Sequence, residues 1–322
     1  MTKRILISLL SIAFLASCGG GNSSQTEESD ITFISPTGAP ALAFYDQGNN
    51  KNYATNSTPS LVLAELQANY YDVVVAPVFG GLKSIKANSA DFALAEVVTG
   101  GNFFLVGVNK EAGELPTSSS YIVAFAEQDV TGMVFKKLAQ EKWNIGTENV
   151  HFVSGAADTL PILKTGKHAS NQVDFVLTAE PVFTNAKQSK DEGVTLVETY
   201  NIQNEWKALT NQESLVQAGV FVRKSSLNSK PNKMKQFFVD LRARIKTALT
   251  NQDAVKTALH EYNEDVKEQA KRFGFNENLA FNLLKNGNRF GLVSPDTKLD
   301  VNAFLVSLGQ TAYSNDYFVT IE

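Results

Sequence analysis

Short apolar runs alternate along the chain with stretches of helical spacing. The run at residues 72–76 (DVVVA) is stopped by Pro77 and has the pattern of a strand buried on both faces. Similar runs predict strands at residues 31–35, 92–98, 103–108, 121–125, 150–153, 175–178, 194–197 and 220–222. Helices are predicted at residues 61–68, 131–141 and 159–165. This alternation predicts βαβ units and largely parallel sheets, which is an α/β fold.

The chain after residue 230 is expected to be mostly helical. Apolar side chains form one stripe at helical spacing, made by Met234, Phe237, Phe238, Leu241, Ile245 and Leu249. Further packing helices are predicted at residues 273–290 and 299–308.

One short sequence pattern occurs twice. Residues 90–96 (ADFALAE) are similar to residues 173–180 (VDFVLTAE), and each follows a predicted helix and a polar turn. This echo fits two lobes of similar α/β design, with one copy in each.

The first residues have the pattern of an export signal. Lys3 and Arg4 precede an apolar run at residues 5–15, which is shorter than the ~20 residues that span a bilayer. Residues 15–18 (LASC) resemble a bacterial lipobox. We therefore predict a lipoprotein signal peptide at residues 1–17, lipidation of Cys18 and a flexible, Gly/Ser-rich tether at residues 18–30. A buried apolar helix with an incidental cysteine is the alternative.

Composition restricts the partners and the chemistry. The 322 residues carry 29 Lys+Arg and 33 Asp+Glu, a net charge of −4, which argues against nucleic acid as a partner. One cysteine excludes an internal disulfide, and with only three histidines no metal and no cofactor is predicted. His151, His168 and His260 are far apart in sequence, and no G-x-S-x-G, H-E-x-x-H, P-loop or C-x-x-C motif is present. No enzymatic activity is predicted.

Four stretches in a fixed order carry a resemblance to a known family. They are residues 35–40 (SPTGAP), 72–77 (DVVVAP), 166–181 (GKHASNQVDFVLTAEP) and 217–224 (QAGVFVRK). Together they cover most of residues 31–249, and with the export signal they resemble the type II solute-binding lipoproteins of ABC importers. Within that class the chain is similar to the branch that handles nitrate, sulfonates, taurine and thiamine-precursor pyrimidines.

The resemblance implies a two-lobed type II periplasmic-binding-protein-like fold with a cleft between the lobes and a helical C-terminal region. Lobe 1 is expected at residues 30–118 plus 214–322 and lobe 2 at residues 119–213, with crossovers near residues 116–120 and 214–220. A ligand is expected between the lobes at the C-terminal ends of strands, where open α/β sheets place their sites. Hinge closure would then trap it.

Thirteen residues at predicted strand ends are the candidate ligand contacts. The loop at residues 37–40 is expected to offer unpaired backbone N–H groups. Each group has a structural alternative, namely a plain turn, a glycine kink or hinge, or a helix cap. In chain order the candidates are Thr37, Gly38, Ala39 and Pro40; Ala76, Pro77, Thr99, Gly100 and Asn102; Ser154, Gly155 and Ala156; and Glu180.

The positions of the arginines bear on the class of solute. None lies between residues 5 and 222, whereas sites for phosphate, sulfonate or carboxylate often use a bidentate arginine. The sequence therefore favours a neutral or cationic solute, such as a heteroaromatic vitamin precursor.

The predicted function is that of a monomeric, extracytoplasmic solute receptor, held to the cell membrane through Cys18 alone and delivering a small molecule to an ABC permease. One alternative is a surface lipoprotein that binds a macromolecular partner. The other is an enzyme of the same fold, such as a menaquinone-precursor dehydratase, against which the lipobox argues. Lobes fused by a large apolar interface would contradict the transport prediction.

Overall fold

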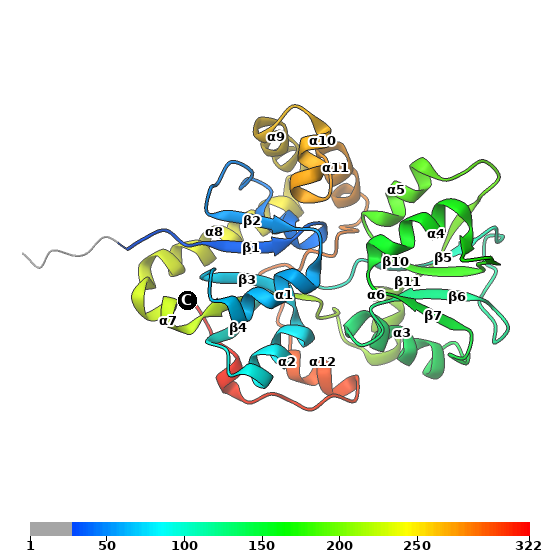
Figure 1. Cartoon of the computed structure of the whole chain (residues 1–322), viewed down its shortest axis with the longest axis horizontal. Helices are drawn as coiled ribbons and strands as arrows, with labels where there is room; N and C mark the ends of the chain where they lie inside the picture. The colour runs from blue at the N-terminus through cyan, green and yellow to red at the C-terminus, as the bar shows by residue number, and fades with distance from the viewer. Residues whose placement is uncertain (1–27) are drawn as a thin grey trace, which may run out of the picture.

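The computed structural model describes residues 28–322. The predicted signal peptide and Cys18 lie outside the described residues. Two five-stranded sheets stand side by side, each covered by helices (Figure 1). Both are mixed sheets, so the predicted α/β class is confirmed. Within residues 28–322, no helix is both long and apolar enough to cross a membrane.

The first sheet has the strand order β2-β1-β3-β12-β4. Its central strand β3 (Val73–Pro77) contains the valine run, and Val73, Val74 and Val75 are all fully buried. β1 pairs in parallel with β2 and β3, while β12 runs antiparallel to β3 and β4. The remaining strands are β1 (Phe33–Pro36), β2 (Tyr53–Asn56), β4 (Phe92–Thr99) and β12 (Ala218–Arg223).

The second sheet has the strand order β11-β5-β10-β6-β7. β10 and β7 run parallel to β6, and β5 runs antiparallel to β10 and β11. Its strands are β5 (Phe103–Val108), β6 (Ile122–Phe125), β7 (Val150–Val153), β10 (Phe175–Ala179) and β11 (Leu196–Asn201). A small hairpin of β8 (Lys167–His168) and β9 (Asn171–Gln172) lies beside it.

One predicted boundary is wrong. The run at residues 103–108 was assigned to lobe 1 with residues 30–118, but as β5 it pairs only with strands of the second sheet. The chain therefore leaves the first sheet at residues 100–102, and the predicted crossover near residues 116–120 lies on the second sheet's side. An apolar run shows that a strand is buried, but it does not show which sheet the strand joins.

Helices fill the connections and the C-terminal region. The predicted helix at residues 159–165 is α4, with the same bounds, and the apolar stripe after residue 230 becomes α8. The predicted helix at residues 273–290 is shorter, because Asn276 caps α11 and the chain turns after Lys285. The helices are α1 (Pro59–Ala68), α2 (Val78–Asn88), α3 (Val130–Glu141), α4 (Thr159–Thr165), α5 (Val182–Ser189), α6 (Ile202–Thr210), α7 (Lys224–Ser229), α8 (Pro231–Thr250), α9 (Gln252–Tyr262), α10 (Val266–Phe273), α11 (Glu277–Lys285) and α12 (Val301–Ser307), with 3₁₀ turns η1 (Ala39–Phe44), η2 (Ala156–Asp158) and η3 (Asn315–Tyr317).

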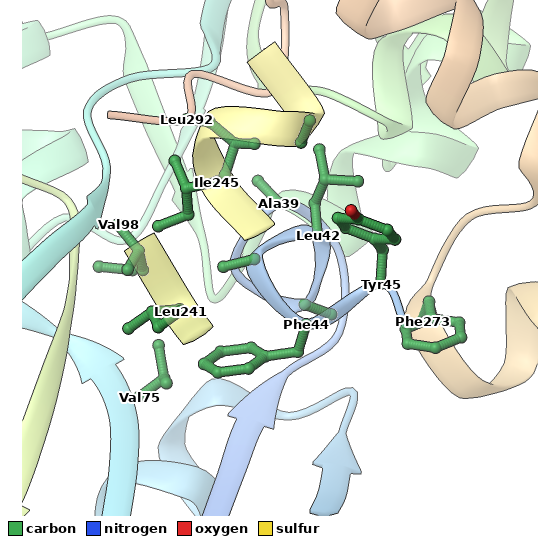
Figure 2. Close-up of a cluster of buried hydrophobic side chains, with 14 of the residues drawn as sticks. Ala39, Leu42, Phe44, Tyr45, Val75, Val98, Leu241, Ile245, Phe273 and Leu292 are labelled. Carbon is green, nitrogen blue, oxygen red and sulfur yellow. The ribbon is translucent and has the colours of Figure 1, made fainter. Parts of the chain in front are cut away.

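The period of two along the strands sends alternate side chains into different cores. On the first sheet, Phe33 packs with η1, α8 and α11 in one cluster, part of which Figure 2 shows, while Ile34 packs on the opposite face with α1 and α2. The cluster that contains Ile34 continues without a break into one face of the second sheet, where it includes Phe103 and Trp206. A third cluster fills the remaining face of the second sheet, against α4 and α5.

The first described residues are attached to the start of α8. The Glu28 carboxylate accepts the Lys233 backbone N–H at 2.9 Å and the Asn232 side-chain amide at 2.9 Å. Free N–H groups at a helix start favour a negative charge there. The chain therefore enters the fold beside α7 and α8, at the end of the molecule farthest from the second sheet (Figure 1).

Candidate functional site

The carboxyl edges of the two sheets meet at the crossover between them. β3 and β4 both end opposite Ala218, the first residue of β12. In the second sheet the end of β10 lies opposite Phe103, the first residue of β5. Only residues 100–102 separate the end of β4 from the start of β5, so the two edges are brought together. Every candidate contact predicted from the sequence lies on one of these edges or between them.

The loop from Thr37 to Pro40 follows β1 and faces the second sheet's side. A β-carbon added at Gly38, which has φ 87°, would lie 3.9 Å from Cδ of Pro181. The expectation of unpaired N–H groups is wrong at two positions. Thr37 donates its N–H to Asn56 O at 3.0 Å and Gly38 donates to Phe273 O at 2.7 Å. Other segments of the protein therefore accept the N–H groups of Thr37 and Gly38, and Ala39 and Pro40 begin η1.

The ends of β3 and β4 use their polar groups to hold the crossover. Ala76 is fully buried, and Pro77 leads directly into α2. The Thr99 hydroxyl, also fully buried, accepts the Ala218 N–H at 3.2 Å. Gly100 donates its N–H to Gly291 O at 2.7 Å. Gly100 is closely packed at this point, because an added β-carbon would collide with the Ser214 hydroxyl.

Asn102 connects the crossover to the end of β10. Its side-chain amide donates to Glu180 O at 2.6 Å, and Glu180 returns its N–H to Asn102 O at 3.0 Å. The Asn102 side chain is almost fully buried, and its Oδ1 has no hydrogen-bond partner within residues 28–322. Asn102 Oδ1 is thus a buried, unpaired acceptor at the junction, the place where the two carboxyl edges meet.

The Glu180 side chain caps the next helix, which is the structural alternative to ligand contact. It is buried, and it accepts the Thr184 N–H at 3.0 Å and the Thr184 hydroxyl at 3.1 Å, so it caps the first turn of α5. It also accepts from Nε of Arg289 at 2.9 Å. Both carboxylate oxygens are therefore engaged by the protein itself.

Arg289 is the junction residue that the sequence analysis missed. Besides Glu180 it contacts Glu198 through Nη1 at 2.8 Å, and its guanidinium lies 4.0 Å from the centre of the Phe104 ring. The next residue, Phe290, is buried in the cluster on the first sheet's outer face. Arg289 therefore links the first sheet's side to the second sheet. No local signal marks it, because its partners lie 91 and 109 residues away.

The cluster after β7 is the open part of the second edge. Ser154 is exposed, and a β-carbon added at Gly155 would meet nothing within 4 Å. Gly155 donates its N–H to the Asp158 carboxylate at 3.0 Å, which is the predicted capping alternative, and Ala156 starts η2. This stretch is sterically free to receive a ligand, unlike the packed ends of β4 and β10.

No protein-family model matches the chain, and no curated protein matches it. Solved structures do match. The ligand-binding component of an ABC-type import system from Staphylococcus aureus, with zinc bound, has a TM-score of 0.67 and 9% identity, covering 90% of this chain and 96% of that one. An ABC transporter structure from Parabacteroides distasonis has a TM-score of 0.57 and 15% identity, covering 84% and 98%.

These similarities define the class of fold. The chain has the type II periplasmic-binding-protein-like fold that the four stretches implied. The neighbours also include the periplasmic aliphatic sulphonate binding protein SsuA from Escherichia coli, with a TM-score of 0.60 and 10% identity, covering 87% of this chain and 85% of that one. At these identities the structural neighbours establish the fold alone.

Proposed function

We propose that this chain is the lipid-anchored, extracytoplasmic substrate-binding protein of an ABC importer. The main support is that the carboxyl edges of the two sheets face each other across residues 100–102. Open α/β sheets bind ligands outside the carboxyl ends of their strands. The neighbours of the same fold include proteins named as ligand-binding or sulphonate-binding components of such importers.

The solute binds between two lobes that follow the sheets, with residues 28–99 and 218–322 in one and residues 103–210 in the other. Residues 100–102 and 211–217 cross between them and form the hinge. The loop at Ser154 and Gly155 is sterically open to the solute, and the buried Asn102 Oδ1 is, within residues 28–322, an unpaired acceptor at the junction. Thr37 and Gly38 contribute from the opposite edge.

The solute is neutral or cationic, and the junction's charges support this. Arg289 is the arginine that reaches the junction, and its guanidinium is shared between two carboxylates. Two acidic side chains against one basic side chain leave a formal charge of −1. A guanidinium already held by two carboxylates is a poor partner for a sulfonate or phosphate, which needs its donors free.

The anchor and the permease complete the proposal. Cys18 carries the lipid, so the membrane contact is made outside the fold. The protein acts as a monomer that presents its closed form to the permease and performs no chemistry.

A second candidate function has one specific observation in its favour. The apolar cluster that joins one face of each sheet includes a contact between Trp206 of α6 and Phe304 of α12, with ring centroids 5.4 Å apart. A large apolar connection holds lobes at a fixed angle, which suits a surface lipoprotein that binds a macromolecular partner. This alternative requires that no small molecule changes the shape of the protein.

Native mass spectrometry of the full-length protein, before and after denaturation, is the first test. A released small molecule of definite mass is expected. If the protein is free of ligand, thermal shift against heteroaromatics, amines and oxyanions follows, since a ligand of the native state raises Tm. Small-angle scattering with the best ligand should then show compaction. Failure of all three measurements would overturn the receptor proposal.

A bulky side chain at Gly155 tests the position of the site. Gly155→Trp is expected to weaken solute binding at least tenfold while Tm stays near that of the parent, because nothing lies within 4 Å of its added β-carbon. The matched control is Gln236→Trp on the exposed face of α8, which should bind as the parent does. Equal affinity in both variants would exclude this edge as the binding site.

A further inference from the structure

A pocket on the outer edge of the second sheet brings together two histidines that are distant in sequence. It has a volume of about 420 Å³ and lies along the edge strand β7, away from the crossover. His151 of β7 and His168 of β8 both line it, and their ring centroids are 6.0 Å apart. The chain has only three histidines, so two of the three lie in this one pocket.

Tyr121 orients both imidazoles. Its ring stacks on His151 with centroids 4.2 Å apart and an interplanar angle of 19°. Its hydroxyl is 3.0 Å from Nδ1 of His168. The tautomer in which Nδ1–H donates to the phenol oxygen leaves the lone pair of Nε2 free, which is the arrangement that a metal-binding histidine uses.

The remaining ring nitrogens have no competing partner. Neither nitrogen of His151 makes a hydrogen bond within residues 28–322, and His168 uses only Nδ1. The one lysine lining the pocket, Lys136, is paired with Glu127 at 2.7 Å, so its charge is compensated. The pocket therefore offers free imidazole nitrogens without an uncompensated cation.

We propose that His151 and His168 form an accessory binding site for a late first-row divalent cation, with Tyr121 as the positioning residue. Imidazole is a preferred donor for copper, nickel and zinc, and copper binds most tightly among them. No group of three or more His, Cys, Asp or Glu gathers around one point in the described part of the chain. Two imidazoles thus bind the ion and water completes its coordination, which makes the site exchangeable.

Titration calorimetry of the full chain with Zn²⁺ and with Cu²⁺ tests the proposal. Every protein carries Cys18→Ser, so that the thiol does not contribute. One saturable site is expected, with Cu²⁺ bound more tightly than Zn²⁺. His151→Gln and His168→Gln should each weaken binding at least tenfold, and Tyr121→Phe by tenfold or more. His260→Gln is the matched control, because His260 lies elsewhere beside Glu277, and it should leave affinity unchanged.

A spectroscopic readout keeps the test valid if a variant folds poorly. Pulsed electron paramagnetic resonance of the Cu²⁺ complex of the parent should show two coordinated imidazoles, and either glutamine variant should show one. Absence of saturable binding, binding that survives both glutamine substitutions, or a Cu²⁺ spectrum without imidazole nitrogen would overturn the proposal. None of these results depends on whether a solute binds at the crossover.

Discussion

Asp72 and Glu180 are both buried carboxylates that connect distant segments. Asp72 connects segments on the first sheet's side, whereas Glu180 connects the second sheet to the first sheet's side. Asp72 lies at the amino end of β3 and accepts from the Thr32 N–H, the Ser226 hydroxyl and Lys230, at 2.9, 2.7 and 2.8 Å. All three partners belong to the first sheet's side. Glu180 lies at the carboxyl edge of the second sheet and is held by Arg289 from the other side.

The difference shows how the same chemistry serves two purposes. A carboxylate whose partners share its lobe stabilises that lobe whatever the hinge angle. A carboxylate whose partner comes from the other lobe also resists any motion that separates them. Asp72 should therefore control stability, while Glu180 should control both stability and hinge motion.

The largest effect is expected from Asp72→Asn. It leaves Lys230 with no carboxylate at a site where the Asp72 side chain is only 6% exposed. Breaking a buried pair in this way should cost about 3 kcal/mol of unfolding free energy, measured by urea denaturation. The control is Glu268→Gln, whose carboxylate faces Lys271 at the surface, and it should cost under about 0.5 kcal/mol. Equal losses would mean that Asp72 is not a structural centre of its lobe.

The next effect should come from Glu180→Gln and Arg289→Met. Each should lower the unfolding free energy by about 2 kcal/mol, and the double variant should fall short of their sum because the two side chains interact directly. Amide exchange should also accelerate at residues 286–293 and 180–184, which Asp72→Asn should leave unchanged at matched stability. The comparison fails if both sites alter exchange in the same places.

Arg289→Lys should have a smaller effect, of about 1 kcal/mol. A lysine places one charge where Arg289 reaches Glu180 and Glu198 through separate nitrogens and covers Phe104. Urea denaturation of this variant beside Arg289→Met measures how much of the interaction depends on the planar guanidinium. A lysine variant as unstable as the methionine variant would show that charge contributes little.

The smallest effect should be on how steeply the unfolding free energy falls at acid pH. Burial alone would raise the pKa of Asp72, but hydrogen bonds from Lys230, Thr32 and Ser226 outweigh it and hold the pKa below its usual value. Because the folded-state pKa is lowered, the stabilisation is complete above the unfolded pKa and is lost as pH falls through the folded one. Unfolding free energies between pH 5 and pH 3 should therefore fall less steeply in Asp72→Asn than in the parent.

Local patterns predicted the elements that depend on local sequence. The valine run of β3 and the bounds of α4 could be predicted because burial of a strand and helix propensity depend on residues that are adjacent in sequence. The β5 assignment failed because sheet membership is decided by partners: β5 pairs with strands about 70 and 90 residues further along the chain. For the Gly-Gly stretch before β5 the sequence suggests either a ligand contact or a kink or hinge, and the predicted crossover lies later, near residues 116–120.

In the candidate site, too, local features could be predicted from the sequence and long-range contacts could not. Strand ends and caps could be predicted, and the capping alternatives describe Glu180 and the Gly155 turn. The Arg289 contacts and the pairing of His151 with His168 could not, since each joins segments whose proximity is a product of the whole fold. Whether the thirteen candidates contact a solute remains a prediction.

The attachment of Glu28 to the start of α8 fixes the point at which the N-terminal segment joins the fold. If Cys18 is lipidated as proposed, a force on the anchor would enter the described fold at α8 and spread through its twenty residues into the first sheet's core. In the proposed hinge motion, the lobe of the second sheet would then be the one that moves relative to the membrane. A solute would thus be bound when the mobile second lobe closes on the membrane-anchored first lobe.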